Sequence, residues 1–511
     1  MEETSAQAPV AVGEAVRVAD QGKAPRDLRE WIKKAEAIGQ LRRITQEVSR
    51  NEEMGAITYM AHQEINSPAL LFERIKESPR GFQALWNPIG SSVDRFALAI
   101  GEPTGVGIMD LIQRCKTKFN NPIPPVVVDP EGVPVNENHL RDEKVDIRAF
   151  PAARHWAGDG GKYVGTCDAV ITRDPDGGWL NVGCYRQMVQ GKNQVGLYLS
   201  PGKDARLHIE RYWSQNEPCE VVVCWGIDPA LFIAASQTFP KTVSELDFVG
   251  GIKGRPVEMV KGEATSLLYP AHVEIAVEGV IPPNSLKLEG PFGEFTGYYG
   301  RPEDLAFLIE VKAVHYRDNP ILTHALMADY PANECALLYS VARSARIWND
   351  LDKLGVPGIK GVYCHPVAGG FAMTIVSLEQ RYAGHAPQVL ALAAQCPGGA
   401  YFSKWIIAVD DDVDPSNINQ VLWAMATRCN PVEDIDILRQ TWSTWLDPTQ
   451  NPPEERPYSS KALINACMEH RYLKQFSKRT KLRRSVYEKV AANWSRLGLP
   501  GTPPKLWALE E

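Results

Sequence analysis

The sequence predicts an α/β protein of several domains, in which a small N-terminal α/β domain and a C-terminal α/β domain with a helical tail flank a central split β-barrel. Three observations predict this fold class. The 511 residues suffice for about three domains with separate cores. Short segments that alternate apolar and polar residues, typical of strands, fill the middle of the chain. Apolar residues at helical spacing occur on both sides of that region.

Two proline-dense runs, 121–135 and 446–457, mark the predicted domain boundaries, because proline interrupts helices and strands alike. The residues ahead of the first helix show no hydrophobic periodicity, so we expect them to be flexible. The predicted parts are a flexible N-terminus (1–23), an N-terminal α/β domain (24–121), a split β-barrel domain (122–330), a C-terminal α/β domain (331–456) and a helical arm (457–511).

The first predicted helix follows Asp27, whose carboxylate can cap it while Glu30 closes a capping box. We expect Gly39 to end this helix, since glycine readily adopts the left-handed conformation that follows a helix. The apolar stripe of the helix comprises Leu28, Trp31, Ile32, Ala35 and Ile38.

Six segments of the central region are predicted as strands from their apolar alternation and β-branched residues. A hairpin is expected to close the set, with residues 317–320 turning between two apolar runs. Few helices are predicted among these strands, which favours a closed or split barrel. The predicted strands are 167–172, 179–189, 195–200, 220–225, 231–235 and 272–280.

A long helix with one apolar face is predicted from Glu334, and Gly355 is expected to stop it. Strands and helices alternate after it, which is typical of an α/β domain. The apolar face comprises Leu337, Leu338, Val341, Ala345, Trp348 and Leu351. The elements predicted next are a strand around Val362, a helix at 386–394, a strand at 403–414 and a helix that begins at Ser416.

Charge and composition exclude several classes of partner. The net charge of −7 at pH 7 argues against a nucleic-acid-binding surface, which needs concentrated basic side chains. No stretch approaches the roughly 18 consecutive apolar residues of a membrane span, so no membrane is expected as a partner. The N-terminus lacks an apolar signal core, and the ten cysteines show neither CxxC pairs nor metal-ligand spacing with histidine. We expect a cytoplasmic protein with reduced thiols.

Two carboxylates five residues apart, Glu289 and Glu294, stand out in the stretch Leu288–Gly300. Glycine and proline force the backbone between them into a tight, non-helical path. Aromatic residues interleave with the acids, so we expect a partly apolar cavity, where burial raises a carboxyl pKa and an arginine partner lowers it. One acid would then stay protonated while the other stays charged. Taken alone, the motif leaves a surface loop open as the alternative. The interleaved residues are Gly290, Pro291, Phe292, Gly293, Phe295, Tyr298 and Tyr299.

Four motifs in order make the chain similar to a known family. They are NVGCYRQ from Asn181, TVSELDFVGG around Glu245, EGPFGEFTGYY from Glu289, and VDDDVD followed by ATRCNP. With these motifs the chain resembles the UbiD-like decarboxylases, enzymes that use prenylated flavin mononucleotide (prenylated FMN). The resemblance extends from Asp27 to Gly498.

The resemblance implies a catalytic network of Arg186, Glu289 and Glu294 over the flavin, in which Glu294 protonates the product. It implies Asn181 and Glu245 as two ligands of a divalent ion, usually Mn²⁺, that ties the flavin phosphate to the protein. It also implies a K⁺ ion nearby, held largely by backbone carbonyls at 234–237. The positions that it implies for cofactor contact are Thr166, Asn181, Val182, Gly183, Cys184, Tyr185, Arg186 and Glu245.

One position departs from the family pattern. Lys203 stands roughly where the family often has a histidine, about seventeen residues after Arg186. A protonated ammonium cannot ligate a metal, but it can neutralise phosphate directly, which puts the Mn²⁺ site in doubt. His208 is the less favoured replacement ligand. Lys404 is a second candidate for phosphate contact, and a surface lysine at the end of a strand is the alternative for it.

The function that the resemblance implies is a non-oxidative, potentially reversible decarboxylation of an aromatic, heteroaromatic or α,β-unsaturated carboxylic acid through a covalent prenylated-FMN adduct. The far wall of the substrate pocket is implied to come from the segment with Trp442, Trp445 and Leu446. Two tryptophans favour a planar ring, bicyclic or heteroaromatic. The alternative is that they belong to a domain-interface core. Hydroxybenzoates, phenazine or indole acids, and aryl-CoA thioesters all stay open as substrates.

Two other functions stay open at this point. A pair of carboxylates can serve a glycoside hydrolase, although this leaves Asn181, Arg186 and Glu245 without a role. A non-catalytic flavin-binding subunit of a larger assembly is the other alternative. The resemblance further implies a flavin prenyltransferase as cofactor supplier and a homodimer, or a higher homo-oligomer, formed through the C-terminal α/β domain.

Overall fold

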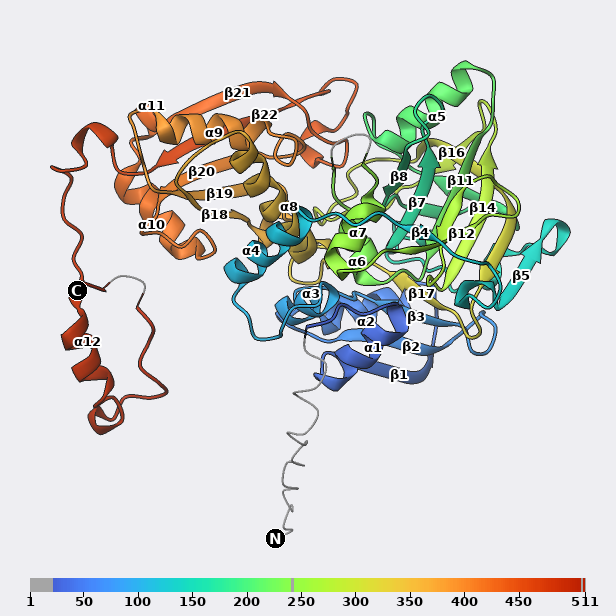
Figure 1. Cartoon of the computed structure of the whole chain (residues 1–511), viewed down its shortest axis with the longest axis horizontal. Helices are drawn as coiled ribbons and strands as arrows, with labels where there is room; N and C mark the ends of the chain where they lie inside the picture. Colours follow the sequence, from blue (N-terminus) through green and yellow to red (C-terminus); the bar gives the residue numbers. More distant parts are fainter. Residues whose placement is uncertain (1–21, 240–242, 507–508, 511) are drawn as a thin grey trace, which may run out of the picture.

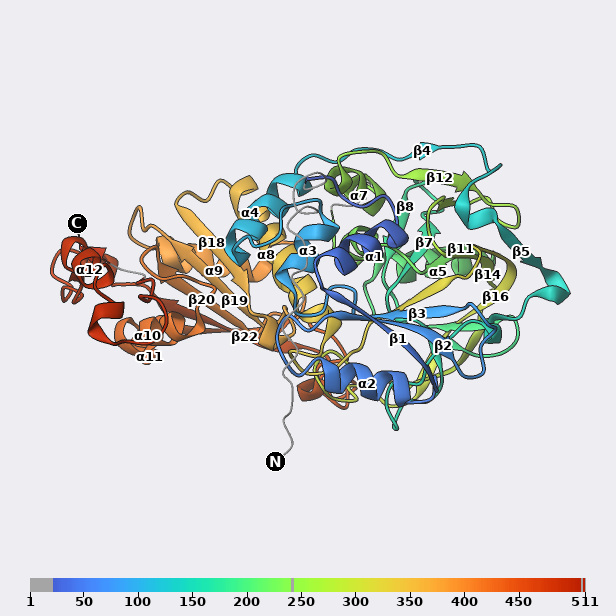
Figure 2. The same ribbon diagram turned by 90° about the horizontal axis from the view of Figure 1, so that it is seen from below.

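The computed structural model describes residues 22–239, 243–506 and 509–510 (Figure 1). It contains a small N-terminal sheet, a ten-stranded central sheet and a five-stranded C-terminal sheet. The N-terminal sheet lies beside the central sheet, and the C-terminal sheet lies at the other end of the molecule (Figure 1, Figure 2). The predicted multi-domain α/β fold class is confirmed. The predicted flexible N-terminus, 1–23, lies outside the described residues except for Gly22 and Lys23.

Helix α1 (Leu28–Ala37) begins as predicted, because the Asp27 carboxylate accepts a hydrogen bond of 2.8 Å from the backbone N–H of Glu30. The Glu30 carboxylate bonds to the N–H of the residue before the cap, so the capping box is shifted by one position. Gly39 follows the helix with a φ of +73°. The predicted stripe is buried except for Ile38, which is 39% exposed because it lies beyond the last turn.

The N-terminal sheet takes its fourth strand from far along the chain. Strand β17 (Ile321–His324) pairs in parallel with β3 (Gln83–Trp86). The predicted hairpin at 317–320 is therefore wrong: the chain turns there but enters a different sheet. All four residues of β17 are buried, which is typical of a strand covered on both faces. The other elements here are β1 (Leu41–Val48), α2 (Glu53–Ala61), β2 (Ala69–Ile75), α3 (Val93–Ala99) and α4 (Ile108–Phe119).

The central sheet curls into a half-barrel. Its strands are β5 (Asn138–Arg141), β6 (Tyr163–Gly165), β7 (Asp168–Arg173), β8 (Leu180–Gly183), β9 (Gln187–Val189), β10 (Gln194–Leu197), β11 (Cys219–Trp225), β14 (Ile275–Ile281), β15 (Leu286–Glu289) and β16 (Asp304–Tyr316). The 13-residue β16 pairs with β10, β14, β15 and β5 and so holds the sheet together. The ends of the sheet, β6 and β8, do not pair with each other in the described part of the chain, so the barrel is split.

Two of the predicted central strands need correction. The segment 179–189 forms two strands, β8 and β9, because Cys184 leaves the ladder and donates its N–H to the carbonyl of Ala235 at 2.9 Å. The segment 231–235 is not a strand but the end of helix α6 (Pro229–Ala235), which Asp228 caps. A short apolar run is compatible with a strand or with a helix. Here the Asp-Pro pair that precedes it favours a helix, because Asp caps helices and Pro is common at their first position. The remaining elements of this region are α5 (Asp204–Ser214), α7 (Glu245–Lys253), β4 (Val126–Val127), β12 (Glu258–Lys261) and β13 (Leu268–Pro270).

The C-terminal domain follows helix α8 (Glu334–Lys353), whose predicted apolar face is buried. Its sheet runs β18 (Ile359–Cys364), β19 (Met373–Leu378), β20 (Trp405–Asp410), β22 (Ser459–Ala466) and β21 (Ile435–Thr441), with helices α9 (His385–Gln395), α10 (Ile418–Arg428) and α11 (Pro431–Asp434). Strand β22 lies within the arm predicted as helical, 457–511, so that prediction is wrong for its first part. The tail then forms β23 (Leu482–Arg483), α12 (Arg484–Ala491) and β24 (Leu509–Glu510), and α12 buries none of its side chains.

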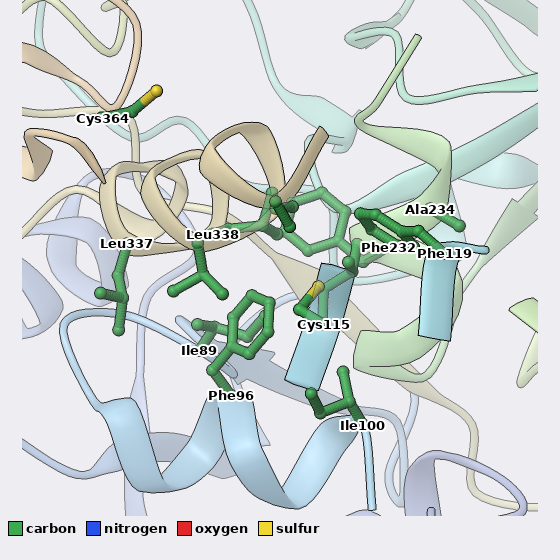
Figure 3. Packing of buried hydrophobic residues seen from close by; sticks show 14 of the residues in the cluster. Ile89, Phe96, Ile100, Cys115, Phe119, Phe232, Ala234, Leu337, Leu338 and Cys364 are labelled. Atoms are coloured by element: carbon green, nitrogen blue, oxygen red, sulfur yellow. The ribbon is translucent and has the colours of Figure 1, made fainter. Parts of the chain in front are cut away.

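One hydrophobic core joins segments from all three regions. Phe96 of α3, Phe119 of α4 and Phe232 of α6 are each at most 4% exposed. Figure 3 shows Phe96 near Leu338 of α8, and Phe119 beside Phe232 farther along the same core. Helix α8 thereby packs against helices α4 and α6. No helix in the described ranges is long and apolar enough to cross a bilayer.

Candidate active site

Arg186 and the two predicted acids meet at one point. The guanidinium donates two hydrogen bonds to the Glu289 carboxylate, from Nε to Oε1 and from Nη2 to Oε2, both 2.9 Å long. Its Nη1 donates to Oε1 of Glu294. The carboxylate side chains are 0% and 6% exposed, so one arginine fork compensates two buried acids. The structure therefore brings together the three side chains that the sequence motifs indicated.

The backbone places each of these side chains where a strand ends. Arg186 lies between β8 and β9, and Glu289 is the last residue of β15. Glu294 lies in the loop after β15, where its N–H donates to the carbonyl of Tyr298 and its carbonyl accepts from Gly297, at 3.0 and 2.9 Å. Strand ends and a closed loop thus carry the cluster.

A segment that the sequence analysis did not assign, 155–160, supports the loop of Glu294. The Asp159 carboxylate accepts hydrogen bonds from two N–H groups of its own turn, at 3.0 and 2.9 Å, and from Gly293 at 3.0 Å. Gly160 lies so close that a Cβ there would stand 1.8 Å from the carbonyl oxygen of Gly290. Only glycine fits at position 160, because the two backbones approach so closely there. In the sequence, the one sign of this support was an acidic residue among glycines.

The charges of the cluster divide between the two acids and the arginine. Burial raises the pKa of Glu294 to about 7, with Arg186 lowering it and the neighbouring Glu289 adding to the rise. Burial alone would lower the pKa of Arg186, but the two carboxylates outweigh it and raise that pKa well above its usual value. Phe292 and Phe295 line the cavity as expected, whereas Tyr298 is 63% exposed and does not help to bury the acid. Glu294 can thus exchange a proton near neutral pH.

Two tyrosines that the sequence analysis missed hold the cluster in place. The Tyr163 hydroxyl donates to Oε1 of Glu289 at 2.9 Å. The Tyr198 ring lies under the guanidinium of Arg186, 4.2 Å from its centre, and Arg301 stacks on the same ring at 4.7 Å. Aromatic faces attract guanidinium ions, so these contacts stabilise the position of the Arg186 guanidinium that binds both acids. No local motif in the sequence indicated either tyrosine.

The cluster opens into a cavity between the half-barrel and the C-terminal domain. Its empty volume is about 1150 Å³, counting the space that opens to solvent. Arg186, Glu294 and Phe292 lie among its lining residues, as does Leu446 from the C-terminal domain. Other lining residues are the aromatic or apolar Tyr185, Tyr198, Phe295, Met327, Tyr339, Phe371 and Tyr401, and the polar Thr166, Ser200, Lys203, Ser236, Gln237, Thr238, Arg343 and Arg346.

The polar lining carries cations that the sequence analysis mostly missed. Arg343 and Arg346 project from α8, where charged residues within a buried helix were the available signal. Arg343 donates from Nη2 to the carbonyl of Tyr401 at 2.6 Å, and its Nε is buried without a partner among the described residues. Lys203 lies 4.5 Å from the centre of the Tyr401 ring. This side of the cavity therefore suits an anionic group.

The residues predicted to contact a flavin lie together around β8. Thr166, Cys184 and Tyr185 line the cavity. Val182 is buried, and Gly183 lies directly under the Tyr185 ring, because a Cβ on that glycine would stand 2.2 Å from it. Tyr185 is thereby turned into the cavity wall.

The predicted metal ligands lie next to each other behind this wall. The Glu245 carboxylate accepts a hydrogen bond of 2.7 Å from the N–H of Val182, the residue after Asn181. Burial raises the pKa of Glu245 to about 8, and the side-chain nitrogen of Asn181 is buried without a partner in the described ranges. His208 bonds to the Thr172 hydroxyl at 3.0 Å. No group of three His, Cys, Asp or Glu side chains suited to a metal occurs among the described residues.

Two predictions at the cavity rim receive no support from the geometry. The Lys404 ammonium bonds to Asp447 at 2.8 Å and to Thr449 at 3.0 Å, and Lys404 is not among the lining residues. Of the predicted substrate wall, Leu446 lines the cavity, whereas Trp442 and Trp445 do not. Trp442 packs its ring edge-on against Tyr401 at 4.9 Å, and Trp445 lies 5.6 Å from the guanidinium of Arg301. Both tryptophans pack around the cavity wall rather than face the cavity.

Comparison with known proteins agrees with this geometry. Three parts of the chain match the N-terminal, Rift-related and C-terminal domains of 3-octaprenyl-4-hydroxybenzoate carboxy-lyase, at residues 32–115, 126–330 and 336–466. A phenolic acid decarboxylase of Bacillus subtilis is 32% identical over 83% of this chain and 89% of its own length. A pyrrole-2-carboxylic acid decarboxylase of Pseudomonas aeruginosa is 30% identical over 88% of this chain and 92% of its own.

Solved structures show the same fold. The vanillic acid decarboxylase of Sedimentibacter hydroxybenzoicus, in its closed form, superposes with a TM-score of 0.84 at 29% identity, over 93% of this chain and 100% of that one. The UbiD-class enzyme HmfF of Pelotomaculum thermopropionicum, solved in an evolved dimeric form with prenylated FMN, superposes with a TM-score of 0.77 at 28% identity, over 90% and 100%. Sequence, fold and the arginine–glutamate cluster together show that the chain belongs to the UbiD family of carboxy-lyases.

Proposed function

We propose that this chain decarboxylates an aromatic or heteroaromatic carboxylic acid with a prenylated FMN bound in the cavity. The observation that carries the proposal is a carboxyl group with a pKa of about 7, Glu294, bonded to Arg186 at the wall of an aromatic-lined cavity. Replacing a carboxyl group by hydrogen requires a proton donor beside the reacting carbon, and a donor works best when its pKa is near the working pH.

The lining of the cavity supports a flavin as its ligand. Its aromatic side suits a planar tricyclic ring, and its cationic side suits the phosphate. Two polar atoms at the cavity, Nε2 of Gln237 and Nε of Arg343, are buried without hydrogen-bond partners among the described residues. A buried donor without a partner costs free energy, so these atoms favour a polar ligand in the cavity.

When bound, a prenylated flavin supplies an electrophilic centre that accepts the electrons left behind as carbon dioxide departs. Arg186 then does two things with its own atoms. Its bidentate pairing with Glu289 fixes the plane of the guanidinium, and its remaining Nη1 edge, which faces Glu294, attracts the substrate carboxylate. Glu289 and Tyr163 are positioning residues in this scheme.

Glu294 holds the proton that replaces the carboxyl group. Burial near Phe292 and Phe295 keeps its carboxyl protonated up to about pH 7, and Arg186 prevents the pKa from rising further. The same apolar side chains reduce the water around the carboxyl group, which favours transfer of its proton to the substrate carbon. In the reverse direction the Glu294 carboxylate would accept the proton from that carbon.

The ions that the resemblance implies fit less well than the flavin. Asn181 and Glu245 offer two oxygen donors, but the third position of the expected set is an ammonium, Lys203, which cannot ligate a metal. We therefore assign no step to a divalent ion. The K⁺ ion predicted at the carbonyls of 234–237 stays a prediction.

The substrate class follows from the relatives and the lining. The relatives named above act on phenolic acids and on pyrrole-2-carboxylic acid, both planar. In this chain Phe292, Met327 and Leu446 line the cavity with Glu294, and such apolar walls favour a flat ring over a sugar. A glycoside hydrolase is disfavoured because its two acids must act on opposite sides of a bond, whereas here one arginine binds both.

Assembly and cofactor supply complete the proposal. We propose that the chain forms at least a homodimer through its C-terminal α/β domain, as the resemblance implies. A flavin prenyltransferase would supply the cofactor. The relatives bear decarboxylase names rather than the names of assembly subunits, which supports an enzyme.

The proposal predicts carbon dioxide release from a planar aromatic acid. The chain, co-expressed with a flavin prenyltransferase, should decarboxylate at least one member of a panel of vanillate, 4-hydroxybenzoate, pyrrole-2-carboxylate and indole-3-carboxylate. Product formation by liquid chromatography is the measurement. The chain produced without the prenyltransferase is the control and should be inactive. Equal turnover in both preparations would contradict the role of the prenylated cofactor.

A further inference from the structure

Lys203 presents a cation to the cavity. It stands at the N-terminus of α5, just before Asp204, and lines the cavity with Ser200 and Ser236. Among the residues that the structure describes, its ammonium forms no ion pair with a carboxylate, and its recorded contact is the Tyr401 ring at 4.5 Å. A half-buried ammonium over an aromatic face is stabilised less than one paired with an anion.

Lys203 shares this part of the cavity with arginines, and one carboxylate, Asp204, follows it in the chain. Burial lowers the pKa of Lys203 to about 8; the charge of Asp204 opposes that change, and Arg343 lowers the pKa further. Arg346, also in the lining, is bound to Asp350 at 3.2 Å. Glu245 is turned to the backbone N–H of Val182. This end of the cavity thus carries more positive than negative charge, which a dianion would neutralise.

We propose that Lys203 contacts the phosphate monoester of the bound flavin directly and replaces the divalent ion, so that this chain binds FMN without a metal. The proposal rests on the function proposed above, since it needs the flavin in the cavity. It deepens that function by naming which residue of this chain holds the phosphate.

Three features favour the ammonium over a metal. By the resemblance, Lys203 occupies roughly the sequence position of the third ligand, and it carries the positive charge that the ion would have supplied. Asn181 and Glu245 alone give two donors, whereas divalent ions of this type take about six oxygen ligands. A phosphate monoester carries nearly two negative charges at pH 7, which Lys203 and Arg343 can share through charge-assisted hydrogen bonds.

The test compares FMN with riboflavin, which has the same ring but no phosphate. Binding of each to the full-length chain is measured by quenching of flavin fluorescence, first with EDTA and then with added Mn²⁺. We expect the wild-type Kd for FMN to agree within about twofold between the two buffers. Lys203→Met should raise the Kd for FMN by about 10- to 100-fold and leave the Kd for riboflavin unchanged. Lys203→His should bind FMN weakly in EDTA and tighten with Mn²⁺.

A matched control loses the same charge elsewhere. Lys312→Met removes an ammonium that pairs with Glu310 on the exposed side of β16, at 3.0 Å, and should bind FMN as the wild type does. If Mn²⁺ lowered the wild-type Kd for FMN by tenfold or more, this inference would be overturned, while the proposed function would stand. An unchanged FMN affinity in Lys203→Met, or no Mn²⁺ effect in Lys203→His, would also overturn this inference. Failure of the wild type to bind FMN in either buffer would overturn the proposed function as well.

Discussion

Replacing Glu294 by glutamine should abolish turnover, by roughly 1000-fold or more, while FMN still binds. Glutamine has the same shape and still accepts the hydrogen bond from Arg186, but it has no proton to give at neutral pH. The measurement is the rate of carbon dioxide release, together with the exchange of solvent deuterium into the product. Both should be lost in the variant, because both need the same proton transfer.

The pH dependence gives this prediction a second readout. Wild-type turnover should fall above about pH 7, by roughly tenfold per pH unit, because the protonated carboxyl is the donor. The folded state also binds this proton more tightly than the unfolded state, whose carboxyl has a pKa of 4.5, so Glu294 makes the wild type lose stability as pH rises from about 4.5 to 7. Glu294→Gln should lack that loss.

The control for Glu294→Gln is Glu310→Gln, which removes a carboxylate from the exposed pair with Lys312. It should retain full activity and an unchanged pH profile. Substantial turnover in Glu294→Gln, with the wild-type pH dependence, would show that another group delivers the proton.

Replacing Arg186 by methionine should cost about 3–5 kcal/mol of folding free energy near pH 8, and it should abolish activity. The change leaves two carboxylates, 0% and 6% exposed, without their cation. Thermal unfolding and denaturant titration measure the stability. The loss should shrink as pH falls, because without the guanidinium the pKa of Glu294 rises above about 7, and its carboxyl becomes neutral more readily.

A surface arginine provides the comparison. Arg206→Met removes a surface arginine that pairs with Glu210, one turn along α5, and both side chains are substantially exposed. Exposed pairs contribute little, so a change of about 0.5 kcal/mol or less is expected. If Arg186→Met unfolded no more easily than Arg206→Met at pH 8, the buried cluster would not have the electrostatic role assigned to it.

Much of the fold could be predicted because local signals agreed with tertiary packing. The cap at Asp27 and the apolar face of α8 were both visible in the sequence and both hold in the structure. The errors arose where a short apolar run has two uses. Residues 231–235 read equally well as strand or helix, and 321–324 read as a hairpin arm although they join a sheet from another part of the chain. Pairing partners far apart in sequence leave no local trace.

The candidate site shows the same division. Arg186, Glu289 and Glu294 could be found because they sit in motifs with glycine and aromatic residues. Tyr163 could not, because a single tyrosine at a strand start carries no sign of the carboxylate 126 residues away to which it donates. The Lys404 prediction finds no support in the geometry for a related reason, since its partner Asp447 comes from a segment whose path the sequence does not give.

The proposed function requires a prenylated flavin in the cavity beside Arg186 and Glu294. The absorbance spectrum and intact native mass of the chain, purified after co-expression with a flavin prenyltransferase, test this most directly. The expected result is a flavin-type spectrum that differs from that of FMN, and a mass increment equal to one prenylated FMN per chain. A folded chain that purifies colourless, with no added mass, from the same cells would contradict it.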